Sequence, residues 1–313
     1  MSAVSGIERI LPKNRRAWLA ARQQDVTAST VGALFRAHEF QTLYGLWCLK
    51  KGLTREDPSE SPAMQRGRLL EPVAVQMIRE AQPDWQVHYN SANEYWRDPV
   101  ARLGATPDTI VTCPRRGLGT VQIKSVEASV YRRKWLDDEG YPDAPLWIAL
   151  QATLEAHLIG AQWAAVAPLV VGHGIECPLI AVELVPGVVE AIRERAAEFW
   201  ASIDADDPPA PDYDRDAGLI ERLHALGDPG EEVDLSSNNR IPELLSEVAE
   251  AKAAKAAASR RKEAAEAEIK ALMGDAVVAH IGRGRRITWR LRKRAAFTAP
   301  ATSYRVLTLP DPE

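Results

Sequence analysis

The sequence has few cysteines, no apolar run of membrane-spanning length, and no histidines at the spacing of metal ligands. Its three cysteines, Cys48, Cys113 and Cys177, are far apart among 313 residues, which argues against a zinc knot or a disulfide framework and suits a reducing cytoplasm. The N-terminal segment lacks the apolar core of a signal peptide, and no segment is long enough to span a bilayer. We therefore expect a cytoplasmic protein.

The sequence also lacks a strong excess of charge of one sign. It has 39 basic and 43 acidic residues and a net charge of −4. A nucleic-acid partner would therefore have to meet a local basic surface, because the molecule as a whole does not attract an anion. A hydrophobic content of 46% with 26% charged residues is ordinary for a globular protein. The length allows one large domain, or one domain with an appendage.

The order of predicted elements indicates a main α/β domain followed by a helical arm. Hydrophobic periodicity predicts helices at 41–53, 64–80, 146–159 and 188–203, with buried strands at 161–171 and 179–184. An acidic, proline-rich stretch then predicts a linker. We expect a main domain over 1–205, a linker over 206–240, and an arm over 241–313 that consists of a long helix, a β-hairpin at 276–292 and a short strand at 302–310.

The main domain is organised around a predicted hairpin. Two strand-like runs, Asp108–Thr112 and Thr120–Lys124, flank a turn rich in proline, arginine and glycine. Gln122 and Lys124 lie two residues apart and therefore share a face, and strand pairing can bring Asp108 beside it. An acid, an amide oxygen and a lysine so arranged can hold a divalent metal against a phosphate and orient a water. Alternating polar residues such as Gln122 and Lys124 are also typical of a solvated strand face, and a Pro-Asp pair is also typical of a turn.

Three further features have both a structural and a functional interpretation. Ser29 precedes a short apolar helix, where it is typical of an N-cap, although such a helix start beside Arg22 also favours a phosphate. Gly67 and Glu71 share a helix face, and a glutamate early in a helix also complements the helix dipole. The basic and aromatic segment 131–135 is typical of a snorkelling helix face or of a nucleic-acid contact.

Taken together, these features resemble the phage lambda exonuclease family, the YqaJ-type viral recombinases within the PD-(D/E)xK nucleases. The resemblance covers about Arg15 to Ile203. It rests on five motifs in the order of the family: Trp18 and Arg22 followed by Thr27 to Ser29, Gly67 with Glu71, Pro107-Asp108 before a strand, Gln122 to Lys124, and the helical Gln151. Each motif alone is weak, whereas five in the right order at compatible spacing are specific.

The resemblance implies both a fold and an activity. The fold would be α/β, a restriction-endonuclease-like core with a small central mixed sheet flanked by helices, plus the helical C-terminal arm and hairpin. The activity would be that of a Mg²⁺-dependent exonuclease, with Mn²⁺ as a substitute, which resects double-stranded DNA from 5′-phosphorylated ends. The 3′ single strand would pass to a single-strand annealing protein. Ring-shaped homo-oligomers and a phage or prophage gene in a bacterial host are implied in the same way.

The resemblance also assigns roles to individual residues. The metal would be held by Asp108, Gln122, the backbone carbonyl of Ile123, and Glu71. Lys124 would orient or activate the attacking water, and Gln151 would support Lys124 or the substrate phosphate. Arg22 and Ser29, with Thr27 in the same motif, would bind the 5′-phosphate.

Gln122 departs from the family, which usually has glutamate at this position. A neutral amide oxygen should bind Mg²⁺ more weakly than a carboxylate does. Three explanations remain: the amide serves as a weaker ligand while Glu71 supplies charge, Glu127 compensates if a bulge reorients it, or the protein binds DNA ends and cuts poorly. We favour the first, and a binding or assembly protein of the same fold is the alternative function. A third interpretation makes the helix 241–273 a scaffold for partners.

Overall fold

The computed structural model describes residues 6–54, 61–225, 231–293, 307, 309 and 310. The chain divides into two compact units, Met1–Leu223 and His224–Glu313. The division falls inside the stretch expected to be a linker, where Tyr213–Leu223 forms helix α7. This helix is held to the first unit because the buried Asp216 accepts a hydrogen bond of 2.5 Å from the hydroxyl of Thr42.

The first unit is built on a mixed six-stranded sheet. Its strands lie in the order β10-β8-β7-β6-β3, with β9 paired to β8. The hairpin predicted from the sequence is present as the antiparallel pair β6 and β7, and β7 runs parallel to β8. The bounds are β3 Gln86–Tyr89, β6 Thr109–Cys113, β7 Gly117–Glu127, β8 Trp163–Val171, β9 Ile175–Glu176 and β10 Ile180–Val182.

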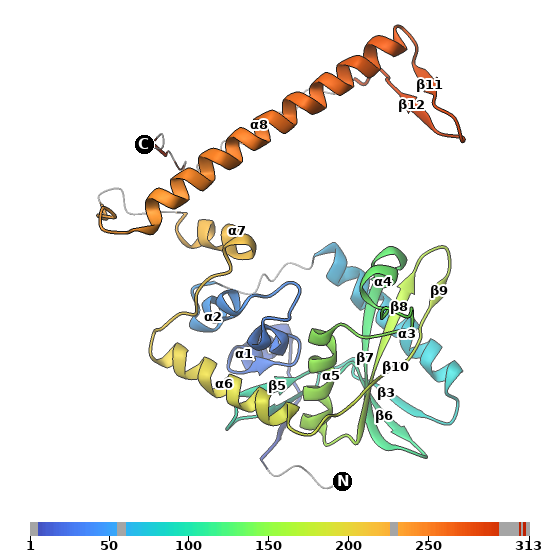
Figure 1. The fold of residues 1–313 in the computed structure, drawn as a ribbon. Coiled ribbons are helices and arrows are strands. Elements are labelled where there is room, and N and C mark those ends of the chain that lie inside the picture. The colour runs from blue at the N-terminus through green and yellow to red at the C-terminus, as the bar shows by residue number, and fades with distance from the viewer. Residues whose placement is uncertain (1–5, 55–60, 226–230, 294–306, 308, 311–313) are drawn as a thin grey trace. The chain divides into compact units, whose positions relative to one another are not determined.

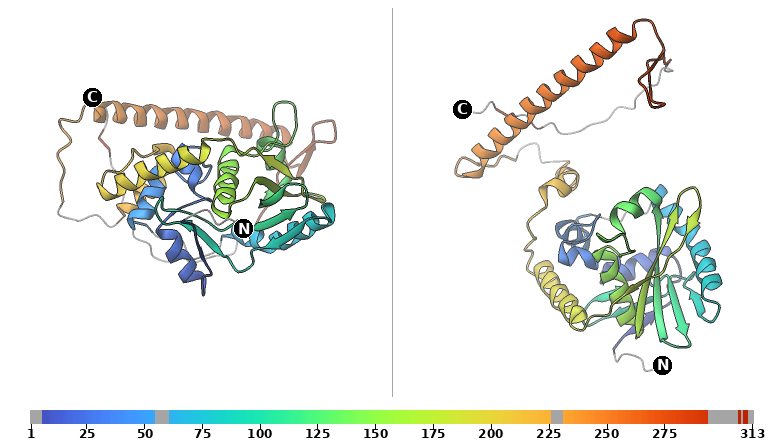
Figure 2. Two further views of the ribbon diagram at one scale, coloured as in Figure 1. Left: turned by 90° about the horizontal axis from the view of Figure 1, so that it is seen from below. Right: turned by 45° about the vertical axis from the view of Figure 1, so that its right-hand side comes forward.

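Helices cover both faces of this sheet, α3 (Pro62–Ala81) on one side and α5 (Leu146–Ile159) on the other (Figures 1 and 2). Ile123 packs in one core cluster with residues of α3, whereas Val126 packs in another with residues of α5. Because strand side chains alternate, the even-numbered residues of β7 point toward α5. The predicted α/β class, a mixed sheet flanked by helices, is therefore confirmed.

A smaller sheet and several helices complete the first unit. The sheet has the order β1-β4-β5-β2, in which β2 pairs with β5 in parallel. Most of these elements surround a third core cluster, which also takes in one side of α5. The bounds are β1 Glu8–Ile10, β2 Val26–Thr27, β4 Tyr95–Asp98, β5 Leu103–Ala105, α1 Arg15–Gln23, α2 Leu43–Lys51, α4 Ala128–Lys134, α6 Val188–Asp204 and the 3-10 helix Val31–Phe35.

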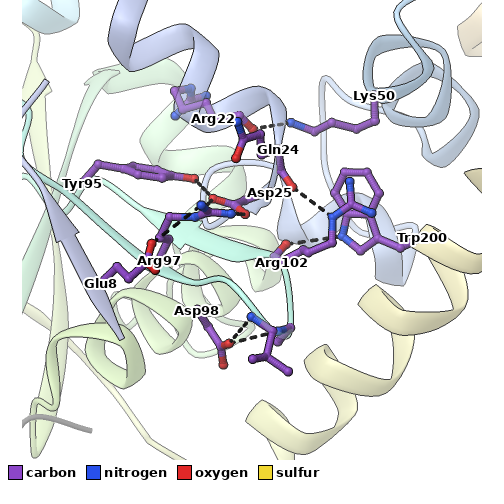
Figure 3. A network of polar contacts seen from close by, with 12 residues as sticks. Glu8, Arg22, Gln24, Asp25, Lys50, Tyr95, Arg97, Asp98, Arg102 and Trp200 are labelled. Atoms are coloured by element: carbon purple, nitrogen blue, oxygen red, sulfur yellow. Dashed lines mark hydrogen bonds and ion pairs between the residues drawn. The ribbon is translucent and has the colours of Figure 1, made fainter. Parts of the chain in front are cut away.

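A buried acid anchors α1 and β2 to the smaller sheet (Figure 3). The carboxylate of Asp25, fully buried, accepts hydrogen bonds of 3.0 and 2.8 Å from Arg97 and one of 2.9 Å from the hydroxyl of Tyr95. Nearby, the guanidinium of Arg102 lies 3.4 Å from the ring centroid of Trp200 on α6. These contacts fix the end of α1, and with it the position of Arg22.

The second unit consists mainly of the helix α8, Arg240–Met273, as the sequence predicted. Its middle segment offers only alanine as an apolar residue, and among the described residues of α8 only Met273 is buried. The predicted hairpin follows as β11 (Val278–His280) and β12 (Arg286–Thr288), which pair antiparallel. The strand expected at 302–310 lies outside the described residues, except for 307, 309 and 310.

Two negative expectations concern thiols and membranes. All three cysteines lie within the described residues and are free thiols. Among the helices that the structure describes, none combines the length and the apolar character needed to cross a bilayer.

Candidate active site

The hairpin brings Asp108 and Gln122 together. Thr109 is opposite Val121, so Asp108 and Gln122 form the next pair of the same register. Oδ2 of Asp108 accepts a hydrogen bond of 2.8 Å from the backbone N–H of Ile123 and one of 2.5 Å from Nε2 of Gln122. Gln122 is only 3% exposed, and its Oε1 has no hydrogen-bond partner. An unpartnered buried oxygen is costly unless a ligand uses it.

A relay of side chains connects Lys124 to helix α5. Nζ of Lys124 donates a hydrogen bond of 2.9 Å to Oε1 of Gln151, and Nε2 of Gln151 donates one of 2.8 Å to Oε1 of Glu155. The two bonds fix which end of the Gln151 amide faces Lys124. Lys124 is thereby held on the α5 side of β7, as strand alternation predicts.

Glu71 reaches the same region from α3. Its carboxylate accepts a hydrogen bond of 3.1 Å from the hydroxyl of Tyr89 at the end of β3. Burial raises the pKa of Glu71, and the charges of Lys124 and Arg68 oppose that shift. Burial, together with the charge of Glu71, raises the pKa of Asp108 to about 7. The charges of Glu71, Asp108 and Lys124 therefore act on one another.

Sequence reasoning missed Glu155. It is 1% exposed, its Oε2 has no hydrogen-bond partner, and burial, with the charge of Asp108 next, raises its pKa well above the ordinary value. A signal was available, because Glu155 lies one turn after Gln151 in an otherwise strongly apolar helix. An acid buried there needs a polar partner, since burial of an unpaired charge is unfavourable.

Glu127, the residue considered as a substitute for a glutamate at position 122, lies at the end of β7. It is exposed, and its Oε1 accepts a hydrogen bond of 2.8 Å from the hydroxyl of Ser129. Because β7 continues regularly through Glu127 in its pairing with β8, no bulge turns this side chain to the face of Gln122.

The residues expected to bind a 5′-phosphate lie together. Nη2 of Arg22 donates a hydrogen bond of 3.3 Å to the hydroxyl of Ser29, which is 3.1 Å from the hydroxyl of Thr27. Thr27 is buried, whereas Arg22 and Ser29 are partly exposed. Arg22 also lies 4.3 Å from the ring of Trp18. The result is a guanidinium and hydroxyl cluster, which is a suitable donor set for a phosphate.

The segment after Ser29 was predicted to be a capped helix, and the structure differs from this prediction. The segment Val31–Phe35 is a 3-10 helix, and the residue before it, Thr30, makes no capping hydrogen bond. The reason is that the hydroxyl of Thr30 donates instead to the carbonyl of Thr27, at 3.1 Å. A phosphate here would therefore rely on side chains more than on a helix N-terminus.

Two connections join this cluster to the hairpin. Nε1 of Trp18 donates a hydrogen bond of 3.0 Å to the hydroxyl of Thr106, two residues before Asp108. On the other side, the carbonyl of Ser29 lies 2.9 Å from Nε2 of His38, whose ring packs 4.5 Å from that of Trp147. Lys124 lies 5.6 Å from the ring of Trp147 in turn. The two groups of predicted residues thus belong to one continuous region.

A cavity of about 410 Å³ opens beside Lys124. Its lining combines cations, aromatic rings and two acids, and includes Arg66, Arg133, Trp147, Phe40, Glu127 and the ion pair of Lys134 with Glu39. In the segment 131–135 the basic side chains are exposed while the ring of Trp135 is buried. The segment therefore offers charge to a ligand, and its tryptophan serves the core.

The donor set of the site fits a hard divalent cation. It includes a carboxylate oxygen of Asp108, the unpartnered Oε1 of Gln122, and the carbonyl of Ile123, which accepts a hydrogen bond of 3.3 Å from Nε2 of Gln122. All three are oxygens of the kind Mg²⁺ prefers. Among the described residues, no three His, Cys, Asp or Glu side chains converge closely enough to form a metal site by themselves. Amide and carbonyl donors would therefore have to contribute. Nε2 of Gln122 faces both Asp108 and the carbonyl of Ile123, so Oε1 would join these two oxygens around a cation after the amide rotates.

Residues 17–154 match the model of the family described as the YqaJ-like viral recombinase domain. The match confirms the resemblance to YqaJ-type recombinases over this stretch, which runs from α1 through most of α5. It includes the predicted residues from Arg22 to Gln151 and ends one residue before Glu155. No curated protein matches the chain.

Several solved structures are similar to the chain. One is an alkaline exonuclease (LHK-Exo) from Laribacter hongkongensis, with 22% identity over 66% of this chain and 99% of that chain, at a TM-score of 0.45. Another is a putative exonuclease from Eubacterium rectale, with 11% identity over 74% of this chain and 98% of that chain, at a TM-score of 0.41.

Proposed function

We propose that this protein is a metal-dependent exodeoxyribonuclease that resects linear double-stranded DNA from 5′-phosphorylated ends. The observation that carries the proposal is the placement of Asp108, Gln122 and Lys124 on one strand pair, with a free buried oxygen on Gln122. The YqaJ-like match over residues 17–154 supports the same activity. The product would be a 3′ single strand for an annealing protein in phage-type recombination within a bacterial cytoplasm.

The proposed metal-binding residues are Asp108, Gln122, the carbonyl of Ile123, and Glu71. A bound Mg²⁺, or Mn²⁺ in its place, would lower the pKa of a coordinated water and offset negative charge on the phosphate. Asp108 is prepared for this role because the N–H of Ile123 and the amide of Gln122 hold one of its oxygens in place. An ordered ligand loses little conformational freedom when it binds.

Lys124 would position the attacking water and stabilise the negative charge that develops on the phosphate. Its ammonium is fixed by the carbonyl oxygen of Gln151, which leaves two N–H donors for the water and the phosphate. The partly enclosed cavity beside Lys124, with Arg66 and Arg133 in its lining, would accept the strand that is being degraded. Arg66, Lys124 and Arg133 there supply a local basic surface, which a chain with a net charge of −4 needs, whereas Lys134 is paired with Glu39.

The cluster of Arg22, Ser29 and Thr27 would bind the terminal 5′-phosphate. Arg22 lies against the ring of Trp18, whose Nε1 donates a hydrogen bond to Thr106, and these two contacts tie the phosphate position to the segment that carries Asp108. A fixed separation between the end of the strand and the metal would determine which phosphodiester bond is cut. A homo-oligomeric ring around the duplex belongs to the same proposal and rests on family resemblance.

The test is nucleotide release from a 5′-phosphorylated linear duplex with Mg²⁺ and with Mn²⁺, for the chain and for Gln122→Glu. Release by both proteins, starting from the 5′ end, is the expected result. Lack of release by both would contradict nuclease activity. A duplex with 5′-hydroxyl ends and a closed circle serve as matched substrates for the end requirement.

The amide of Gln122 favours a second candidate function, a DNA-end-binding or assembly protein that cuts weakly or not at all. Loss of one anionic ligand is the physical reason, because Mg²⁺ binds a neutral oxygen less strongly. This candidate predicts tight binding of duplex ends by the chain, with release only after Gln122→Glu. A scaffold role for α8 is tested by a chain that ends before Arg240, which retains nuclease activity if the helix only recruits partners.

A further inference from the structure

Glu155 and Gln122 lie at the same level on the facing surfaces of α5 and β7. Helix α5 precedes β8 through a short turn, so it runs opposite to β8 and to the parallel strand β7. Four residues forward along α5 from Gln151 span about 6 Å, and two residues backward along β7 from Lys124 span about 6.6 Å. Because the two elements run antiparallel, both steps lead the same way in space. The advance along α5 leads from Gln151 to Glu155, and the matching step along β7 leads from Lys124 to Gln122.

Each of these two residues carries a buried oxygen without a hydrogen-bond partner. These are Oε1 of Gln122 and Oε2 of Glu155, in side chains that are 3% and 1% exposed. The other oxygen of Glu155 is already used by Gln151, at 2.8 Å, which orients the carboxylate. Two unsatisfied acceptors at the same level, beside the carboxylate of Asp108, need a shared donor or a cation.

The charges around the site point to a cation. Two acids, Asp108 and the buried Glu155, flank this site, and the ammonium of Lys124 is linked to Glu155 only through Gln151. Ionised carboxylates in a buried site are unfavourable unless opposite charge compensates them. A divalent cation would offset the excess of negative charge.

We propose that Glu155 supplies the second metal-binding carboxylate, which the strand lacks because position 122 is glutamine. The acidic ligand is thus provided by helix α5 in place of strand β7, and Gln122 contributes a neutral oxygen beside it. This inference rests on the proposed metal-dependent function. It gives a chain with an amide at this position a charged ligand from the neighbouring helix.

The test is direct binding of Mn²⁺ to the full chain, measured by isothermal titration calorimetry without DNA. Glu155→Gln keeps the size of the side chain and its contact with Gln151 and removes the charge. We expect it to weaken Mn²⁺ binding by at least about tenfold. The double variant Gln122→Glu with Glu155→Gln should restore the affinity to within about threefold of the parent, because the carboxylate returns from the other side of the site. Glu127→Gln, an exposed acid at the end of the same strand, is the matched control and should bind as the parent does.

The outcomes separate this inference from the proposed function. If Asp108→Asn loses Mn²⁺ and Glu155→Gln binds as tightly as the parent, the ligand role of Glu155 is overturned while the metal site stands. The ligand role is also overturned if Glu155→Gln slows cleavage without changing Mn²⁺ binding. Glu155 would then be a residue that positions Gln151. If neither the parent nor Gln122→Glu binds Mn²⁺, the proposed function fails as well. Circular dichroism and thermal unfolding confirm that each variant is folded.

Discussion

Two buried acids in the first unit have opposite surroundings. Asp25 is enclosed by Arg97 and Tyr95, which together donate three hydrogen bonds to its carboxylate. Glu155 is equally buried, yet one of its oxygens has no partner, and the charge that faces it from Asp108 has the same sign. Figure 3 shows the closed arrangement around Asp25, which leaves its carboxylate paired on both oxygens.

The difference teaches how a structural acid can be told from a functional one. A buried carboxylate that is paired and hydrogen-bonded stabilises the fold, because removing it deprives a cation and a hydroxyl of a buried partner. One whose hydrogen-bonding capacity is unused lowers stability until a ligand binds. Asp25 accordingly holds α1 and β2 in place, whereas Glu155 keeps one oxygen without a partner and, with Asp108, belongs to the site that we propose binds metal.

The largest effect is expected at the open site. Asp108→Ala and Lys124→Ala should each reduce nucleotide release by about 10³- to 10⁴-fold, since one removes a metal ligand and the other the charge that orients water. Melting temperatures should change little. The measurement is release from a 5′-phosphorylated duplex, with the exposed Asp84→Ala as control. Near-normal rates in either variant would remove that residue from the site.

The closed site should show the reverse pattern. Asp25→Ala is expected to lower the free energy of unfolding by about 3 to 5 kcal/mol, because Arg97 loses its buried partner. Chemical denaturation measures this value, and Asp84→Ala again serves as control. A loss below about 1 kcal/mol, the value of an exposed ion pair, would show that the Asp25 network contributes little.

Arg22 lies between the two arrangements, since it joins the fold through Trp18 and the proposed phosphate cluster through Ser29. Arg22→Ala should reduce the preference for 5′-phosphate over 5′-hydroxyl ends by about tenfold or more, as expected for a charged hydrogen bond. The comparison is made between the two substrates in one variant. Arg16→Ala, an exposed arginine on the same helix, should keep the preference. An unchanged preference in Arg22→Ala would contradict the phosphate role.

The smallest effect is a pH dependence of stability in metal-free protein. The raised pKa of Asp108, about 7, means that the folded state retains a proton that the unfolded chain loses near pH 4. Stability contributed by this group therefore falls as pH rises from about 4 to 7. Asp108→Asn should flatten that slope, as measured by thermal unfolding at a series of pH values. Identical slopes in the variant and the parent would contradict the shift.

Much of the site follows from local sequence because it depends on short-range geometry. Alternation along a strand places Gln122 and Lys124 on one face, and a hairpin with a short turn can pair only neighbouring segments, so Asp108 lies beside Gln122. The prediction of a capped helix after Ser29 was wrong, because the segment forms an uncapped 3-10 helix. Hydroxyl contacts among Thr27, Ser29 and Thr30 compete with capping.

The sequence by itself determined the central hairpin, the strands at 161–171 and 179–184, the main helices and the motif residues, since periodicity and turn residues act over a few positions. The smaller sheet and helix α7 were not predicted. Only the tertiary structure decided that α5 lies opposite β7 with Glu155 at the level of Gln122, and that Trp18 reaches Thr106 from α1. These contacts join segments far apart in the chain. Their geometry depends on how helices pack on a twisted sheet, and local propensities carry no information about that packing.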